Sequence, residues 1–377
     1  MATSAIGPGF LTQTTVFTQQ LLASFGFVIL ISVLLDIGAQ MNIWRVLAVT
    51  EKHAQDIANA LLPGLGYFVA ALIVVGGLAF NVGNMAGCGL GLNVLTGMDT
   101  IYGSIISCIM ALFLFWMKEA GKAMDLFAKV LGVLIFLLTL YVAFSSQPPL
   151  GDAVYRTFVP EKINVVSIVT LVGGTVGGYI CFAGGHRLLD AGIKGQAALP
   201  EVTRSSVTGI LVTAFMRVVL FLAALGVVMK GGILDGNNPP ASVFKLAAGE
   251  LGYRFFGVVM WAASITSVVG ASYTSISFLR TFHPWIGRND RWLISFIIVF
   301  ATLVFVFIGQ PVKILITVAA LNGLVLPITL AIMLLAARSV KLVGNYRHPL
   351  VLQVAGWIVV IVMSWMSYHT LATWLGI

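Results

Sequence analysis

The sequence predicts an all-α polytopic membrane protein with eleven crossings, arranged as two five-helix halves of opposite orientation and a C-terminal eleventh helix. Hydrophobic residues make up 59% of the 377 positions and charged residues 9%, whereas about a quarter of the residues of a soluble protein are charged. Apolar stretches of about 20 residues, the length that crosses a bilayer, recur along the chain. Because the net charge of +8 falls in the loops, we expect no nucleic-acid partner.

Each predicted helix is an apolar stretch that ends at a polar or proline-containing connection. The eleven helices are expected at 1–25, 26–49, 65–93, 101–117, 126–144, 165–189, 207–229, 253–279, 292–308, 312–337 and 351–375. The chain is therefore a single membrane domain, 1–377, with a first repeat at 1–145, a second at 163–337 and the last helix at 351–375.

The distribution of Lys and Arg predicts the orientation. Arg45, Lys52, Arg204 and Arg338 fall at alternate connections that share one side of the membrane, and the other side carries fewer basic residues. By the positive-inside rule, the N-terminus is cytoplasmic and the C-terminus lies outside, in a bacterial inner (plasma) membrane. Because only six residues precede Gly7 and half a bilayer needs roughly 10 helical residues, we expect the first helix to begin upstream of Met1.

Two predicted helices are interrupted at matching places in the two halves. The first contains Gly7-Pro8-Gly9 within "AIGPGFLTQTT", and the sixth reads "TLVGGTVGGYICFAGGHRLLD". Matched interruptions of this kind indicate a transport site at the bilayer midplane. The alternatives are that the glycines only allow close helix packing, or that the scaffold serves a channel or a non-transporting receptor. No catalytic constellation or phosphate loop stands out, so we predict no enzyme activity.

The segments "GPGF", "GGTVGGY" and "LVLP" resemble the NRAMP (natural resistance-associated macrophage protein) divalent-metal transporters over nearly the whole chain. The resemblance implies a LeuT-type inverted-repeat fold, alternating access and ion-coupled transport of a divalent metal ion. The family's Asp-Pro-Gly-Asn motif falls on Gly7, Pro8, Gly9 and Phe10, its Met-Pro-His motif on Gly177, Gly178 and Tyr179, and its acidic pair on Asn81 and Asn84.

The usual metal ligands are therefore replaced, while the interruptions of the helices are kept. Mn²⁺ and Fe²⁺ prefer carboxylate and imidazole ligands that neither interruption supplies, so we expect no tight Mn²⁺ binding and name no confident metal ligand. Restoring the ligands with Gly7→Asp and Gly177→Met should raise Mn²⁺ affinity. A hydrated Mg²⁺ ion, which makes fewer direct protein contacts, is a further alternative.

Two ionisable residues lie deep within predicted crossings, Asp36 in the second and Arg217 in the seventh. Charges at such depth form pairs or mark a pathway. They are either a structural pair, or a proton or sodium site at Asp36 with an anion anchor at Arg217. The second interpretation favours symport of a small organic anion, and the resemblance links relatives with this helix-1 variant to pyroglutamate, a carboxylate.

The partners expected are thus a small solute or ion, the lipid bilayer and a coupling H⁺ or Na⁺, with no other cofactor and with a monomer favoured. The candidate substrate-binding residues are Gly7, Pro8, Gly9, Phe10, Thr12, Gly177, Gly178 and Tyr179, and the candidate coupling or pathway residues are Asp36, Asn81, Asn84 and Arg217.

Overall fold

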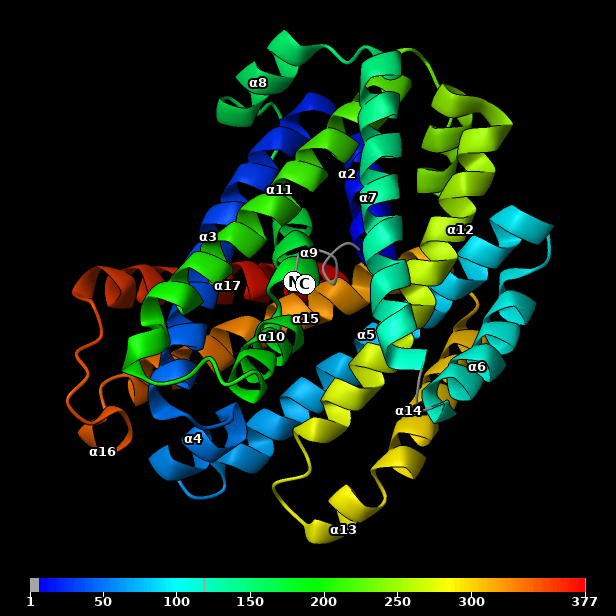
Figure 1. Cartoon of the computed structure of the whole chain (residues 1–377). Helices are drawn as coiled ribbons and strands as arrows, with labels where there is room; N and C mark the ends of the chain where they lie inside the picture. Colours follow the sequence, from blue (N-terminus) through cyan, green and yellow to red (C-terminus); the bar gives the residue numbers. More distant parts are fainter. Residues whose placement is uncertain (1–6, 118–119, 377) are drawn as a thin grey trace.

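The computed structural model describes residues 7–117 and 120–376, and this part of the chain contains helices and no strands (Figure 1). The long helices are α2 (Pro8–Leu21), α3 (Phe25–Thr50), α5 (Leu65–Thr96), α6 (Thr100–Trp116), α7 (Ala120–Ser146), α9 (Val165–Thr175), α10 (Gly178–Asp190), α11 (Leu199–Met229), α12 (Pro239–Ser277), α14 (Asp290–Ile308), α15 (Pro311–Ala336) and α17 (Leu350–Leu375). The short elements are η1 (Leu22–Ser24), α4 (Ala54–Leu61), α8 (Leu150–Phe158), η2 (Gln196–Ala198), α13 (Pro284–Arg288) and α16 (Val340–Val343).

The described helices confirm an integral membrane protein. Eight helical segments are long and apolar enough to span a bilayer, and the first of them, Pro8–Thr50, joins α2, η1 and α3. A ninth span is reached if α7 is taken with α8, to which it is bent by 106°. The 17-residue α6 is a shorter apolar helix. The predicted order of apolar helices therefore matches the structure closely.

The starts of α11 and α12 differ from the prediction. The sequence places these helices from 207 and 253, but they begin at Leu199 and Pro239. Proline suits the first turn of a helix, where its missing N–H costs nothing, and the Asn238 side chain caps α12 by accepting from the Ala241 N–H at 3.4 Å. Gly249, with φ +67°, then interrupts α12. Pro239 thus opens a helix and does not lie in a loop.

The short helices α4 and α8 were also missed by the sequence analysis. Each of them places apolar residues on one face and polar residues on the other, and each has fewer than ten residues. A search for long apolar runs passes over helices of this kind, which suit the membrane surface. They connect spanning helices without crossing the bilayer.

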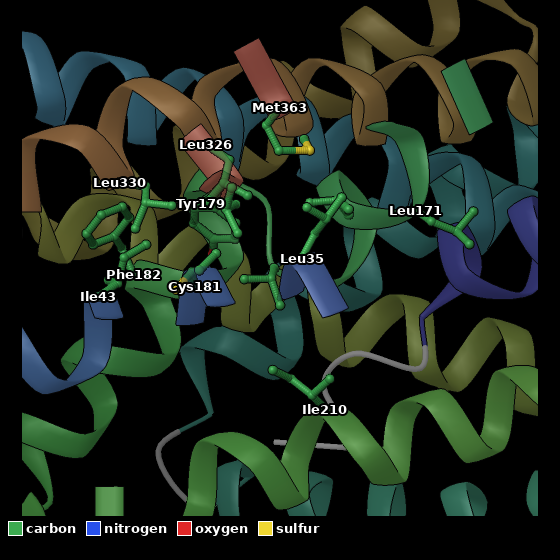
Figure 2. Close-up of a cluster of buried hydrophobic side chains, with 14 of the residues drawn as sticks. Leu35, Ile43, Leu171, Tyr179, Cys181, Phe182, Ile210, Leu326, Leu330 and Met363 are labelled. Carbon is green, nitrogen blue, oxygen red and sulfur yellow. The ribbon is translucent and has the colours of Figure 1, made fainter. Parts of the chain in front are cut away.

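A large apolar core joins the helices around the middle of the molecule. Figure 2 shows Leu35 of α3, Leu171 of α9, Ile210 of α11, Leu326 of α15 and Met363 of α17 in one buried cluster. In a bilayer, packing rather than exclusion from water holds such helices together. The cluster places α3, α11 and α15 around the interrupted pair α9 and α10.

Helices α5 and α12 run side by side (Figure 1). At several glycines of α5 the neighbouring atoms are so close that no side chain would fit. A Cβ at Gly91 would lie 2.6 Å from the Trp261 backbone nitrogen, and one at Gly87 would overlap the Pro8 ring and sit 2.5 Å from Ser264 Oγ. Small residues allow this close approach of helices in membranes. The contact between Gly87 and Pro8 also positions the start of α2 against α5.

Candidate functional site

The predicted interruption of the sixth crossing is present. Helix α9 ends at Thr175 and α10 begins at Gly178, so Val176 and Gly177 form the break and Gly174 stays helical. A Cβ at Gly177 would overlap the Gly173 carbonyl oxygen and lie 2.9 Å from Asn322 Cβ. Glycine is therefore required at this position for close packing against α15.

The first crossing shows the matching feature at its described end. Gly7 is extended and caps α2, Pro8 opens the helix, and Gly9 and Phe10 already lie in its first turn. The predicted non-helical stretch of Gly7–Gly9 thus ends at Pro8, because a proline at N1 begins a helix as readily as it interrupts one. The half of the crossing that precedes Gly7 falls outside the described residues.

Arg217 of α11 connects the two breaks. Its side chain is 3% exposed. The guanidinium Nη2 donates to Thr175 Oγ1 at 3.1 Å, and the guanidinium carbon lies 4.6 Å from the ring centre of Phe10. Thr175 is the last residue of α9, and Phe10 is in the first turn of α2. A fixed positive charge with a cation–π partner therefore faces both interruptions.

Asp36 of α3 is the second buried charge, with 2% exposure. It attracts Arg217 electrostatically, yet the ion pairs found within 4.0 Å among the described residues do not join the two. Its Oδ1 atom has no hydrogen-bond partner within the described part of the chain. The guanidinium is instead directed to Thr175 and Phe10, so the structural pair, which the sequence left open as one of two alternatives, is not seen as a direct contact.

Two buried amides near the breaks were missed by the sequence analysis. Gln13 of α2 donates from Nε2 to the Leu315 carbonyl at 3.4 Å, and its Oε1 lies 2.7 Å from where a Cβ at Gly174 would be. Asn322 of α15 donates from Nδ2 to the carbonyls of Gly76 and Val318 at 3.2 and 3.1 Å. An amide within an apolar crossing is the signal that could have found both.

The oxygens of these amides have no hydrogen-bond donor among the described residues, and neither does Thr12 Oγ1. A buried oxygen without a donor costs about 1–3 kcal/mol, and each of these oxygens is able to accept a hydrogen bond or to coordinate a cation. We use the term break cluster for the five polar residues that surround the interruptions, Thr12, Gln13, Asp36, Arg217 and Asn322.

The comparisons with known proteins agree with this architecture. The family model described as Natural resistance-associated macrophage protein-like (Nramp) matches residues 1–373. The chain belongs to the Nramp family. A Bacillus subtilis (strain 168) protein described as the uncharacterized membrane protein YcsG is 61% identical over 373 residues, which cover 99% of this chain and 92% of that protein.

Solved structures share the fold of this Nramp chain. A variant of the Eremococcus coleocola manganese transporter matches with a TM-score of 0.76 and 17% identity, covering 100% of this chain and 86% of that one. MhsT in complex with L-phenylalanine matches with a TM-score of 0.67 and 14% identity, covering 97% and 96%. The expected LeuT-type fold is confirmed, and the protein is a membrane transporter rather than an enzyme.

The two positions at which the resemblance places Nramp ligand side chains differ in the space around them. No described atom lies within 4 Å of a Cβ added at Gly7, whereas Gly177 is crowded by Gly173 and Asn322. Gly178 is also confined, since its Cβ would lie 2.6 Å from Val325 Cγ1. Side chains can therefore be introduced at the first break far more easily than at the second.

Of three other candidate residues, Tyr179 and Asn81 form hydrogen bonds to α12 and Asn84 does not. The Tyr179 hydroxyl donates to the Ala271 carbonyl at 3.1 Å, and Asn81 Nδ2 donates to Ser272 Oγ at 2.5 Å. Asn84 is buried in α5, and its Nδ2 has no acceptor among the described residues. The side chains of Tyr179 and Asn81 thus tie α10 and α5 to α12, and they add little to the polar lining of the breaks.

No metal-binding cluster is found in the described residues, 7–117 and 120–376. Nowhere in these ranges do three His, Cys, Asp or Glu side chains converge as ligands of one ion. The donors around the breaks are amide, hydroxyl and backbone oxygens with one carboxylate, Asp36. Such a set suits a weakly held or partly hydrated ion better than a tightly stripped transition metal.

A second polar cluster, the α3 network, consists of the buried Asn42 and His348 and the half-buried Arg45 and Tyr346. Asn42 Nδ2 donates to the carbonyls of Gly38 and Leu352, so its Oδ1 accepts from His348 Nε2 at 2.7 Å. His348 Nδ1 then accepts from the Tyr346 hydroxyl at 3.1 Å, whose oxygen accepts from Arg45 Nε at 3.2 Å.

Because the Asn42 Oδ1 atom can only accept, His348 carries a proton on Nε2, and the lowered pKa of the ring leaves Nδ1 free to accept from Tyr346. Burial lowers the pKa of His348 to about 4, and the positive charge of Arg45 adds to this effect. The α3 network therefore joins the end of α3 to the segment before α17 through groups that satisfy one another.

Proposed function

We propose that this Nramp-family protein is an ion-coupled secondary transporter of a small organic anion that carries a carboxylate. The observation that supports this cargo is the buried guanidinium of Arg217, which lies against both helix breaks. The solute would bind between the starts of α2 and α10, with the carboxylate on Arg217. Alternating movement of the proposed halves, 1–145 and 163–337, would expose it to each side in turn.

Electrostatics favours an anion at this place. A buried unit charge interacts strongly with a ligand because little water screens it, and Arg217 repels a divalent cation twice as strongly as it attracts a monoanion. The N-terminal ends of α2, at Pro8, and α10, at Gly178, carry partial positive charge. Both ends add to the attraction of a carboxylate.

The same charges suggest how transport is coupled. Asp36 and Arg217 together are neutral when both are ionised, so a bound monoanion leaves one uncompensated negative charge in the membrane interior. Buried charges of this kind are costly unless they are neutralised. Entry of one H⁺ on Asp36, or of one Na⁺ beside it, restores neutrality. We therefore propose symport with a cation, with Asp36 as the coupling residue.

A second candidate is transport of a divalent metal ion. It is favoured by membership in the Nramp family and by the similarity of fold to a manganese transporter. The unpartnered oxygens of Thr12, Gln13 and Asn322 supply neutral oxygen donors, which suit a partly hydrated Mg²⁺ better than Mn²⁺. In this alternative Asp36 would balance part of the ion's charge.

The proposal extends to the membrane setting and the orientation of the protein. The bias of Lys and Arg supports a bacterial inner membrane location with a cytoplasmic N-terminus and an external C-terminus. We propose a monomer as the transporting unit.

Uptake into proteoliposomes tests the cargo. Uptake of radiolabelled pyroglutamate, and then of other small monocarboxylates, is measured for wild type, Arg217→Gln and the control Arg288→Gln. Arg288 is exposed on α13. Mn²⁺ and Mg²⁺ uptake are measured in parallel. We expect carboxylate uptake driven by an inward H⁺ or Na⁺ gradient, reduced about thirtyfold or more by Arg217→Gln alone. Metal uptake by wild type without any carboxylate uptake would overturn the proposal in favour of the second candidate.

A further inference from the structure

A cavity of about 560 Å³ lies between α3 and the beginning of α11, away from the breaks. Its polar lining comes from Arg45, Thr203, Arg204 and Thr208, and its apolar lining includes Leu199 and Val207. Arg204 is 13 residues before Arg217 on α11, which is about 20 Å along the helix. The cavity is therefore separate from the proposed transport site.

The two arginines of this cavity are not neutralised by carboxylates. Arg45 is held by neutral oxygens, with Nη1 donating to Thr203 Oγ1 at 2.7 Å and Nε to the Tyr346 hydroxyl at 3.2 Å. Among the described residues, the ion pairs within 4.0 Å include neither Arg45 nor Arg204. By contrast, Lys194 pairs with Glu51 at 3.1 Å.

The position of the cavity limits what enters it. Arg45 lies near the end of α3 at Thr50, and Arg204 lies near the beginning of α11 at Leu199. Both helices span the membrane, so their ends lie at the boundary between hydrocarbon and water. A ligand there meets two guanidinium groups together with the apolar side chains of Leu199 and Val207.

We propose that this cavity binds a phosphate group attached to an apolar or glycerol portion, with Arg45 and Arg204 as its ligands. Arginine suits phosphate because its planar donors form two hydrogen bonds to one anion. The group comes either from the head of an anionic phospholipid or from a soluble phosphate ester. Basic pockets between spanning helices at a membrane surface are of the type that holds anionic lipid heads.

Lipid retention tests the first source. Wild type, Arg204→Gln and Arg288→Gln are placed in nanodiscs of equimolar phosphatidylcholine and phosphatidylglycerol, and lipid that remains bound after extraction is identified by native mass spectrometry. Arg204 is exposed, so its replacement should leave thermal unfolding unchanged. We expect selective retention of phosphatidylglycerol by wild type and Arg288→Gln, and about tenfold or greater loss in Arg204→Gln, because one charge-assisted bond is removed.

A second experiment tests whether the ligand is a soluble phosphate ester. Delipidated wild type and both variants are titrated with inorganic phosphate and with glycerol phosphate, and the midpoint of thermal unfolding is followed. The site is assigned to a soluble ester if phosphate raises the midpoint of thermal unfolding of wild type and Arg288→Gln but not of Arg204→Gln, and if no lipid is retained. If Arg204→Gln and Arg288→Gln retain phosphatidylglycerol equally and neither phosphate compound shifts wild type, the proposal is wrong. Neither result depends on uptake through the breaks.

Discussion

The break cluster and the α3 network both contain buried polar residues, yet they differ in how completely their groups are partnered. In the α3 network the amide of Asn42, the imidazole of His348 and the hydroxyl of Tyr346 form a continuous chain of hydrogen bonds. In the break cluster, oxygens of Gln13 and Asn322 have no donor among the described residues. The comparison teaches that the α3 network satisfies its own polar groups and so stabilises the fold, whereas the break cluster keeps acceptors that our proposal assigns to a ligand.

The largest expected effect on stability follows from replacing one of the two buried charged residues, Asp36 or Arg217. Arg217→Gln or Asp36→Asn alone leaves the other charge uncompensated, which should cost roughly 3–5 kcal/mol of stability. The double variant should recover thermal stability because no charge remains. If the two charges serve only structure, the double variant transports as wild type does.

If Arg217 anchors the anion, the double variant folds but takes up no carboxylate. Uptake into proteoliposomes, normalised to folded protein, distinguishes the two results. Equal uptake by wild type and the double variant would contradict the anchoring role and leave the break cluster no more functional than the α3 network.

A pair of amide-to-leucine substitutions compares the two clusters directly. Asn42→Leu removes the acceptor of His348 Nε2 and the donor to Leu352, so unfolding should become easier by roughly 3–4 kcal/mol. Gln13→Leu removes one long bond of 3.4 Å to Leu315 and should change stability by less than about 1 kcal/mol.

For transport, the order of the two variants should be the reverse of that for stability. Uptake per folded protein should fall in Gln13→Leu and persist in Asn42→Leu, because the first residue lies at the break and the second does not. Thermal unfolding and uptake are measured on the same preparations. A stability loss of the same size in both variants would remove the distinction between the clusters.

The pH dependence of stability sharpens the description of the α3 network. The unfolded imidazole titrates near 6.5, and the folded pKa of His348 is about 4, so the unfolded state binds the proton first. Stability is fully present above pH 6.5 and falls as the pH drops toward 4, by on the order of 3 kcal/mol in total.

The variant His348→Gln keeps a donor for Asn42 without a titrating ring and serves as the control. The difference between the unfolding free energies of wild type and His348→Gln should therefore shrink as the pH falls from 6.5 to 4. A difference that stays constant over this range would show that His348 does not remain neutral in the folded protein.

The smallest expected effect concerns the two glycines at the breaks. The sequence suggests Gly7→Asp together with Gly177→Met, but the second does not fit, since a Cβ there overlaps the Gly173 carbonyl. Gly177→Met should cost about 1–3 kcal/mol by overpacking. Gly7→Asp meets no described atom within 4 Å of its Cβ and should raise Mn²⁺ affinity about tenfold, equivalent to about 1.4 kcal/mol.

Calorimetric titration with Mn²⁺ checks this prediction, with Gly7→Ala as the control without a carboxylate. Micromolar Mn²⁺ binding by wild type would contradict the expectation that the altered ligands weaken metal binding, and it would support the second candidate cargo.

Much of the architecture follows from the sequence because it depends on local properties. Apolar length fixes which segments span the membrane. Gly7 and Pro8 fix where α2 begins, and Gly177 among its glycine neighbours fixes where the sixth crossing is interrupted. The depth of Asp36 and Arg217 also follows from counting along a helix. Amphipathic helices such as α8 escape this reasoning because their apolar face appears only when the helix packs.

The tertiary structure alone decided which polar groups meet. Whether Arg217 faces Asp36, lipid or the breaks depends on how α11 is rotated against α2 and α9. Its hydrogen bond to Thr175 and its cation–π contact with Phe10 show that it faces the ends of α9 and α2. The same holds for the open oxygens of Gln13 and Asn322 and for the crowding at Gly177. Sequence spacing sets the position of a residue along its own helix, whereas its neighbours across the bundle are set by helix packing, which is a property of the whole chain.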